Sequence, residues 1–199
     1  MTEKTPKKTE RVIVGVSGAS GALYALSLMK QLAQLQIETH LVVSKSARLT
    51  LAYEHGQDAR FGPADHEYSA TDVGAPIASG SFKTRGMIVA PCSIKTMSEI
   101  ATGVTSTLLT RAADVCLKER RPLVLMVRET PFHLGHLRTM TALAEMGAII
   151  APPLPAFYAE PSTVEDMVDQ SVARCLDLIG LDSPLTRRWG EDLEKGRRP

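Results

Sequence analysis

The sequence predicts an α/β protein built as three layers, with a doubly wound parallel sheet between two sets of helices. Short apolar runs alternate with helical segments along the chain, which is typical of right-handed strand–helix–strand units. The runs are rich in β-branched residues and are not interrupted by polar ones, as expected of strands buried on both faces. Polar residues directly follow most of these runs, and ligands of such sheets bind where the strands end.

The first strand is predicted at 12–16, where Val-Ile-Val-Gly-Val forms a short, mostly β-branched run. Only small residues follow at 17–21, and the segment from 22 to 30 has the composition of a helix. Glycines let the backbone approach a ligand, and free N–H groups at a helix start attract an anion. The glycines are spaced three apart, which matches neither the dinucleotide fingerprint nor the lysine-containing phosphate loop. The stretch therefore indicates either a small phosphate-bearing ligand or a tight turn that binds nothing.

The second strand–helix unit is followed by a long irregular excursion. A strand is predicted at 37–43, and Ser44 stands where it would cap a helix that continues to about residue 55. Glycines and prolines punctuate 56–80, where we expect mostly irregular backbone with one short strand near Tyr68. An irregular segment this long in a compact domain is usually a lid or a subunit contact.

Three more strands and four more helices are predicted in the second half of the chain. The strands are expected at 87–90, 122–127 and 148–150, and the helices at 97–101, 107–119, 133–146 and 163–179. Thr105 and Ser106 are the expected cap of the second of these helices, Gly147 ends the third, and Thr163 caps the last. A short basic segment at 184–190 completes the predicted domain.

The overall composition limits the class of protein and its surroundings. With 199 residues, 44% of them hydrophobic and 23% charged, we expect a single domain at 11–190 between flexible tails at 1–10 and 191–199. A formal net charge of +1 indicates neither nucleic acid nor a membrane as a partner, and no apolar run is long enough to span a bilayer. The three cysteines are scattered and odd in number, so we expect a reducing compartment, the cytoplasm, and no structural disulfides.

Two polar stretches at predicted strand ends are candidate anion-binding groups. Ser93, Lys95 and Thr96 open a helix, where N–H groups, hydroxyls and an ammonium could hold a phosphate or simply cap the helix. Arg128 and Glu129 follow the fourth strand. The arginine could bind a phosphate and the glutamate accept a proton, or the two could form an ordinary exposed pair.

Other chemistry-bearing residues favour structural interpretations when each is considered alone. Lys118 lies in a basic segment at a helix end, where the helix dipole favours cations. His133 and His136 have no acidic or cysteine partner at metal-ligand spacing, so we expect no metal. Glu54 is either a surface residue or an acid turned inward, and Trp189, the single tryptophan, is either a packing anchor or a cover over a ligand.

Eight short motifs, taken in order, resemble the UbiX flavin prenyltransferase family over residues 11–190. They are Gly-Val-Ser-Gly-Ala-Ser-Gly at 15–21, Ser-Lys-Ser-Ala at 44–47, Ala-Pro-Cys-Ser-Ile-Lys-Thr at 90–96, Arg-Ala-Ala-Asp-Val at 111–115, Lys-Glu-Arg-Arg-Pro-Leu-Val-Leu at 118–125, Arg-Glu-Thr-Pro at 128–131, Pro-Ala-Phe-Tyr at 155–158 and Arg-Arg-Trp-Gly at 187–190. Each motif alone is weak, but the ordered set is highly specific. The resemblance implies a flavodoxin-like or Rossmann-like fold, assembly as a homododecamer, and active sites at subunit contacts.

The resemblance also implies a reaction. Reduced FMN would accept a dimethylallyl group from dimethylallyl phosphate, first at N5 and then at C6 of the flavin, giving prenylated FMN and inorganic phosphate. No metal is implied, and the chain has no Asp-Asp-x-x-Asp motif of the kind that binds magnesium in most prenyltransferases. The product would serve UbiD-type decarboxylases, often in ubiquinone synthesis, so such an enzyme is the implied partner.

Position by position, the resemblance assigns roles to residues of this chain. FMN is expected on Gly18, Ala19, Ser20, Ser44, Ser93, Ile94, Lys95, Thr96 and Arg128. The prenyl phosphate is expected on Tyr158 and Arg174, with Lys118, Arg128 and Glu129 nearby and some of these groups from a neighbouring subunit. Ser20 and Glu54 are implied as an acid relay to the leaving phosphate, Glu129 as a base or proton shuttle for ring closure, and Trp189 as a lid on the pocket.

One stretch departs from the family pattern, and two other functions stay open. Some relatives carry a tryptophan before Ala-Ser-Gly-Ser, where this chain has Thr71-Asp72-Val73-Gly74, so a gating role for that loop is not assigned. A flavin-dependent decarboxylase of cysteine-derived carboxylates shares the fold, but its catalytic histidine and its Pro-Ala-Ser-x-Asn-Thr stretch are not found where they are needed. A non-catalytic FMN carrier or partner subunit predicts flavin binding without turnover.

Overall fold

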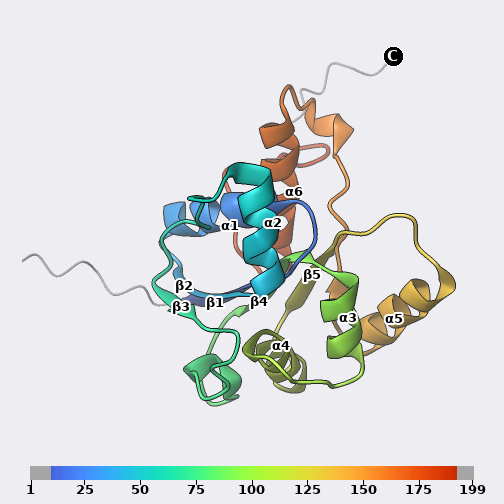
Figure 1. Ribbon diagram of the computed structural model, residues 1–199. Helices are drawn as coiled ribbons and strands as arrows, with labels where there is room; N and C mark the ends of the chain where they lie inside the picture. The colour runs from blue at the N-terminus through green and yellow to red at the C-terminus, as the bar shows by residue number, and fades with distance from the viewer. Residues whose placement is uncertain (1–9, 192–199) are drawn as a thin grey trace, which may run out of the picture.

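A six-stranded parallel sheet forms the centre of the molecule (Figure 1). The computed structural model describes residues 10–191, so the predicted tails lie, but for Glu10 and Glu191, outside the described residues. The strands run across the sheet in the order β3-β2-β1-β4-β5-β6, and every neighbouring pair is parallel. They are β1 (Arg11–Val16), β2 (Glu38–Val43), β3 (His66–Tyr68), β4 (Gly86–Cys92), β5 (Leu123–Val127) and β6 (Ile149–Ile150).

The strand order reverses between β1 and β4, and the loops at such a reversal form the ligand crevice of doubly wound sheets. From β1 the chain steps outward to β2 and β3, then crosses back to β4 and continues outward to β5 and β6. Ser17, directly after β1, joins the two central strands at this point. Its hydroxyl donates to the Pro91 carbonyl (3.1 Å) and accepts from the Ser93 N–H (2.7 Å).

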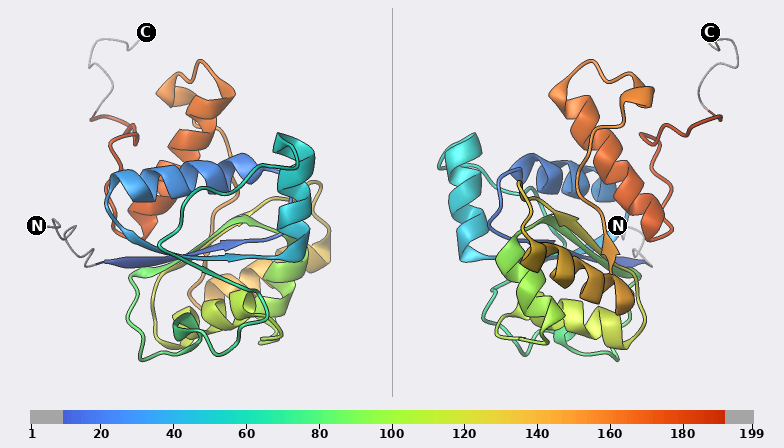
Figure 2. Two further views of the ribbon diagram at one scale, coloured as in Figure 1. Left: turned by 60° about the vertical axis from the view of Figure 1, so that its left-hand side comes forward. Right: turned by 90° about the vertical axis from the view of Figure 1, so that its right-hand side faces the viewer.

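Two helical layers cover the two faces of the sheet, as both views in Figure 2 show. The helices on one face are α1 (Ala22–Gln34), α2 (Lys45–His55) and α6 (Val164–Leu178), and those on the other are α3 (Ile94–Ala101), α4 (Leu108–Lys118) and α5 (Leu134–Glu145). Neighbouring residues of β1 pack into opposite layers, with Val12 and Val14 on the α1 side and Ile13 on the α4 side. The predicted three-layer fold is confirmed, and burial on both faces explains the uninterrupted apolar runs.

One predicted helix start and one predicted helix cap are wrong. Helix α3 begins at Ile94 rather than near residue 97, because Ser93 caps it by accepting a hydrogen bond from the Thr96 N–H (3.3 Å). Helix α4 is capped by Thr107 rather than by the two residues before it, because Thr107 and Thr110 each accept the other's backbone N–H. The other predicted helix signals are confirmed, at Ser44, Gly147 and Thr163.

The segment at 56–80 is mostly irregular, as predicted, and contains two short elements. Strand β3 forms the edge of the sheet near Tyr68, and the 3-10 helix η1 (Pro76–Ala78) buries Ile77 on the α4 side. A second 3-10 helix, η2 (Phe157–Ala159), precedes α6. Among the helices of residues 10–191, none combines the length and the apolar character needed to cross a membrane.

A polar network joins β3 to β2. Glu38 Oε1 lies 3.1 Å from His40 Nε2, 3.4 Å from His66 Nε2 and 3.0 Å from Arg11 Nε. The two histidine rings stack at 4.7 Å with an interplanar angle of 18°, so their lone pairs lie in near-parallel planes and do not converge on one point. The carboxylate oxygen between them is already bonded to a guanidinium. We therefore interpret this group as a hydrogen-bonded network rather than a metal site.

The buried member of this network predicts a pH-dependent stability. Burial lowers the pKa of His40, the charges of His66 and Arg11 lower it further, and Glu38 only partly opposes them, while Tyr68 bonds the other ring nitrogen. The unfolded chain therefore takes up this proton first as the pH falls below about 6.5, and the folded state loses stability by up to about 1.4 kcal/mol per pH unit.

Urea unfolding at several pH values between 7.5 and 5.5 (roughly one unit either side of the ordinary histidine pKa) measures the slope of the free energy of unfolding against pH. His40→Gln should have a shallower slope than the unaltered protein, whereas His55→Gln, at an exposed position of α2, should keep it. Equal slopes for the protein and its His40 variant would contradict the assignment.

Candidate active site at the carboxyl edge of the sheet

The loop after β1 lies tightly against the start of α2. A Cβ atom added to Gly18 would lie 2.3 Å from the Ser46 hydroxyl and 2.4 Å from the Ser46 Cβ, so only glycine fits at this position. Ser44 is the N-cap of α2, and its hydroxyl accepts from the Ala47 N–H (3.1 Å). The predicted residues Gly18, Ala19, Ser20 and Ser44 are thus brought together at one corner of the sheet.

The start of α3 is joined to the same corner through Ser17. Ser93 donates its N–H to the Ser17 hydroxyl and caps α3 with its own hydroxyl, which also lies 3.2 Å from the Thr96 hydroxyl. Ser93 therefore caps the helix, which is one of the two interpretations of this motif. It leaves other N–H groups of the first turn open to a ligand. Lys95 is exposed and lies 3.8 Å from Glu99, so its ammonium points along α3.

Glu54, near the end of α2, supplies a negative group at the start of α1. Gly21 is the N-cap of α1, has a left-handed backbone (φ 106°) and offers no side chain to cap the helix. The Glu54 carboxylate accepts from the N–H groups of Gly21 (2.9 Å) and Ala22 (2.8 Å) instead. The neighbouring Ser20 hydroxyl also lowers the pKa of this carboxyl. The anion facing this helix start is therefore a side chain of the protein itself.

These hydrogen bonds keep Glu54 ionised. Burial raises the pKa of the Glu54 carboxyl, but the bonds from Ala22, Gly21 and Ser20 outweigh burial and hold the pKa below its usual range. The two interpretations open from the sequence each hold in part: Glu54 is exposed, as a surface residue is, and its carboxylate is turned toward the β1–α1 loop.

Arg128 and Glu129 directly follow β5. The Arg128 N–H donates to the Cys92 carbonyl (3.0 Å), which ties the end of β5 to the end of β4. Burial raises the pKa of Tyr24 on α1, and the charge of Arg128 opposes that rise. The Glu129 carboxylate is exposed and accepts from the Thr130 N–H (2.9 Å).

Tyr158 and Arg174 line one small cavity, of about 110 Å³, beside Met126 of β5 and the loop that follows β6. Trp189 packs edge-to-face on Tyr158, with ring centroids 5.6 Å apart and an interplanar angle of 89°. Arg174 lies 3.6 Å from the Asp177 carboxylate. Three of the residues expected at the prenyl donor are therefore close together, at the ends of the last two strands.

Lys118 is the one predicted donor ligand that lies apart from the others within a single chain. It ends α4 beside Gly80, at the edge of the sheet where β5 begins, whereas the other residues lie where strands end. Its ammonium pairs with the Glu119 carboxylate and holds the pKa of that carboxyl below its usual range. Within one chain, Lys118 and the other predicted donor ligands therefore lie at opposite ends of the strands.

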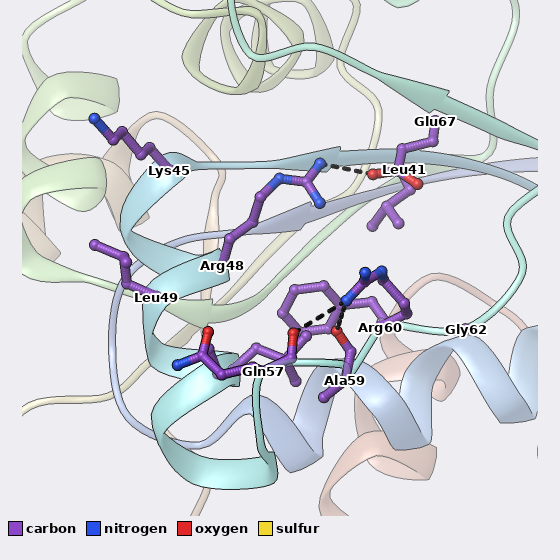
Figure 3. A pocket seen from close by; sticks show the side chains of 12 residues that line it. Leu41, Lys45, Arg48, Leu49, Gln57, Ala59, Arg60, Gly62 and Glu67 are labelled. Carbon is purple, nitrogen blue, oxygen red and sulfur yellow. Dashed lines mark hydrogen bonds and ion pairs between the residues drawn. The ribbon is translucent and has the colours of Figure 1, made fainter.

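A larger cavity, of about 480 Å³, contains none of the predicted site residues (Figure 3). It lies between α2, β2 and the segment at 57–62. Figure 3 shows Arg48 extended to Glu67 (2.6 Å) and Arg60 turned to the carbonyls of Gln57 and Ala59. Both guanidinium groups are therefore already engaged by the protein, and size alone does not make this cavity the site.

Cysteine and histidine side chains at the described positions have structural surroundings. All three cysteines are unpaired and buried, and burial raises the pKa of Cys92, Cys116 and Cys175 to about 12, which leaves no reactive thiolate. His133 caps α5 by accepting from the Gly135 N–H (3.0 Å), and its ring packs on His136 at 3.6 Å. The pair of histidines noted in the sequence thus forms the start of a helix.

Two residues that shape the site were not predicted. The charge of Arg128 acts on the pKa of Tyr24, and Gln170 lines the cavity of Tyr158 and Arg174. Both belong to the apolar or polar pattern of an ordinary helix, so the sequence carries no local signal that separates them from their neighbours.

Comparisons with known proteins identify relatives of this chain and of its fold. A family model described as Flavoprotein matches residues 1–176. The flavin prenyltransferase UbiX of Thauera aromatica is 52% identical over 187 residues, covering 93% of this chain and 96% of the relative. The crystal structure of AnUbiX in complex with FMN and dimethylallyl pyrophosphate has a TM-score of 0.86 at 44% identity, covering 92% of this chain and 98% of that one. A dodecameric FMN-dependent UbiX-like decarboxylase from Escherichia coli O157:H7 has a TM-score of 0.86 at 48% identity, covering 90% and 98%.

Proposed function

This chain belongs to the Flavoprotein family and, within it, to the UbiX-type flavin prenyltransferases, and from that membership we propose the reaction it catalyses. The enzyme joins a dimethylallyl group from dimethylallyl phosphate to N5 and then to C6 of reduced FMN. Inorganic phosphate is the leaving group, and no metal takes part. The proposal keeps the FMN-binding, donor-binding and proton-transfer roles that the resemblance assigns to residues of this chain.

FMN is the flavin of this enzyme. Its proposed binding site is the edge of the sheet where β1, β2, β4 and β5 end. Contacts run along this edge from Ser44 and the glycine loop through Ser17 to Ser93 and Arg128. N–H groups at helix starts and a guanidinium suit the phosphate of the flavin. The first turn of α3 supplies the remaining proposed contacts, from Ile94, Lys95 and Thr96.

The Glu54 carboxylate, which is ionised and held by the two N–H groups that follow Ser20, carries the proposal. Breaking an allylic C–O bond produces a phosphate that gains negative charge. A phosphate dianion near Glu54 would raise the pKa of that carboxyl, because like charges disfavour ionisation. Glu54 would then hold a proton that the Ser20 hydroxyl passes to the leaving oxygen. A protein that only carries FMN has no use for such a relay.

Other predicted groups would stabilise both products of the bond cleavage, the phosphate and the allylic cation. Preorganised cations and hydroxyls, from Arg128, Tyr158, Arg174 and a neighbour's Lys118, would stabilise the developing phosphate charge. The aromatic pair Tyr158 and Trp189 would face the allylic cation and keep water from it. Glu129, exposed at the end of β5, is the proposed base for the proton that C6 loses on ring closure.

A homo-oligomer, with twelve copies as in the Escherichia coli relative, is part of the proposal. Helix α5 supports it, because Leu143 is the only buried residue of that helix. Phe132, Leu134 and Leu137 expose large apolar side chains nearby. An exposed apolar surface of this kind marks a protein contact. A UbiD-type decarboxylase as recipient of the product, and a cytoplasmic location suited to unpaired cysteines, complete the proposal.

The test is an anaerobic reaction of the purified protein with reduced FMN and dimethylallyl phosphate, followed by mass spectrometry of the extracted flavin. We expect the flavin to gain one five-carbon prenyl unit, with or without a chelator. A parallel reaction with the diphosphate distinguishes the two donors. Flavin that is bound but unmodified with either donor would overturn prenyl transfer and favour the carrier.

A further inference from the structure

Trp189 is held at the proposed donor site although its own side chain is mostly exposed. The residue is 75% exposed, and its ring contact with Tyr158 is made edge-on at 5.6 Å. A side chain that buries so little apolar surface gains little from packing and cannot fix its own position. The residues on either side of it in the chain must therefore set its place.

Gln170 of α6 anchors the chain two residues before Trp189. Its amide nitrogen donates to the Arg187 carbonyl (3.0 Å), and its amide oxygen accepts from the Arg187 N–H (2.9 Å). Gln170 is only 6% exposed, so an unpaired amide there would be strongly unfavourable. Because both bonds are made to backbone atoms, they define the path of the chain whatever side chain stands at position 187.

Asp177, two turns further along α6, anchors the residue directly before Trp189. Its side chain is 6% exposed and accepts from both terminal nitrogens of Arg188, at 3.0 and 2.9 Å. A two-point arginine–carboxylate pair sets orientation as well as distance. The same carboxylate lies 3.6 Å from Arg174, so one side chain contacts both a proposed donor ligand and the segment that carries the indole.

We propose that Gln170 is the positioning residue for Trp189, with Asp177 as the second anchor. Gln170 also lines the cavity of Tyr158 and Arg174, so it links the wall of that cavity to its cover. This inference rests on the proposed function, in which Trp189 covers the bound donor. Loss of the anchor weakens binding of the donor and leaves FMN binding unchanged, because Gln170, Asp177 and the segment that they hold are not among the proposed FMN contacts.

The single tryptophan makes the motion of residue 189 directly measurable. In Gln170→Leu without substrates, time-resolved fluorescence anisotropy should show about twofold more of the fast component that reports indole motion on the nanosecond scale. With substrates, the KM for dimethylallyl phosphate should rise about tenfold while kcat and FMN affinity stay within about twofold. Gln170→Glu keeps the hydrogen-bond acceptor but loses the donor. Its indole mobility and its KM should therefore lie between those of Gln170→Leu and the unaltered protein.

Two matched variants separate this role from a general loss of stability. Arg187→Ala keeps both backbone bonds, and Gln34→Leu makes the same chemical change at an exposed position of α1, so both should behave as the unaltered protein. If Gln170→Leu does not fold, Arg188→Ala removes the second anchor from the surface and should give the same two changes.

Unchanged anisotropy in the anchor variants overturns the proposal, and so does a mobile indole with an unchanged donor KM. If the unaltered protein does not prenylate FMN, the proposed function fails. The anisotropy measurement needs no substrate, so it still decides whether Gln170 holds Trp189.

Discussion

Replacing Glu54 with glutamine is expected to lower the rate of prenyl transfer by about 100- to 10,000-fold, the usual effect of removing a general acid. The amide has the same size, and its oxygen can still accept the N–H groups of Gly21 and Ala22, so the loop keeps its shape. The proton that Ser20 relays is what the variant loses. Single-turnover reactions followed by mass spectrometry of the flavin measure the rate, and fluorescence titration checks that FMN still binds.

The same variant separates catalysis from helix capping. We expect its free energy of unfolding to fall by only about 1 kcal/mol, because a neutral amide replaces a charged cap at the start of α1. Glu67→Gln removes a carboxylate that pairs with Arg48 at the neighbouring cavity, and it should react as the unaltered protein does. A Glu54 variant that reacts within about tenfold of the unaltered rate would show that Glu54 is the cap of α1 and not the acid.

Particles that mix Lys118→Ala chains with Glu54→Gln chains should have activity that neither variant has alone, because Lys118 is expected to act in the site of a neighbouring copy. Alone, Lys118→Ala should lower transfer by about 100-fold or more by removing a cation from the phosphate charge. In mixed particles, a site on a Lys118→Ala chain beside a Glu54→Gln chain has both groups intact. Random assembly of equal amounts makes about a quarter of the sites of this kind.

Co-expression with two affinity tags and tandem purification yields the mixed particles for this assay. The Lys118 pair with Glu119 is an exposed ion pair, which contributes little to stability, so lost activity in Lys118→Ala does not reflect unfolding. A mixture of Glu54→Gln with Ser20→Ala is the control, because every chain then lacks a group of its own site and activity should stay low. The role in a neighbouring copy is contradicted if the Lys118 mixture is equally inactive.

Elements whose causes lie within a few residues could be predicted from the sequence. The run at Val12–Val16, the caps at Ser44 and Thr163, and the stop at Gly147 each depend on their immediate neighbours, and the structure has them as expected. The start of α3 was misplaced because its apolar spacing becomes clear only at Met97, although the capping serine stands four residues earlier. Local capping chemistry decided that boundary.

Features that depend on distant segments could not be predicted. Glu54 lies 33 residues after Gly21, and nothing near it in the sequence indicates that its carboxylate turns to the start of α1. The bonds between Gln170 and Arg187 likewise join a helix to a loop that follows it. Lys118 lies at a helix end, as its local sequence predicts, whereas a function for it in a second copy of the chain follows only from the resemblance to a family and from no local pattern.

Helix α5 links the stability of the chain to its concentration. It has 12 residues and one buried side chain, and a helix of that length is marginal in water without packing. In dilute monomer its amide hydrogens should exchange quickly with solvent, and association that covers Phe132, Leu134 and Leu137 should slow that exchange. The melting temperature should therefore rise with protein concentration, because subunit association completes a layer that one copy leaves half-packed.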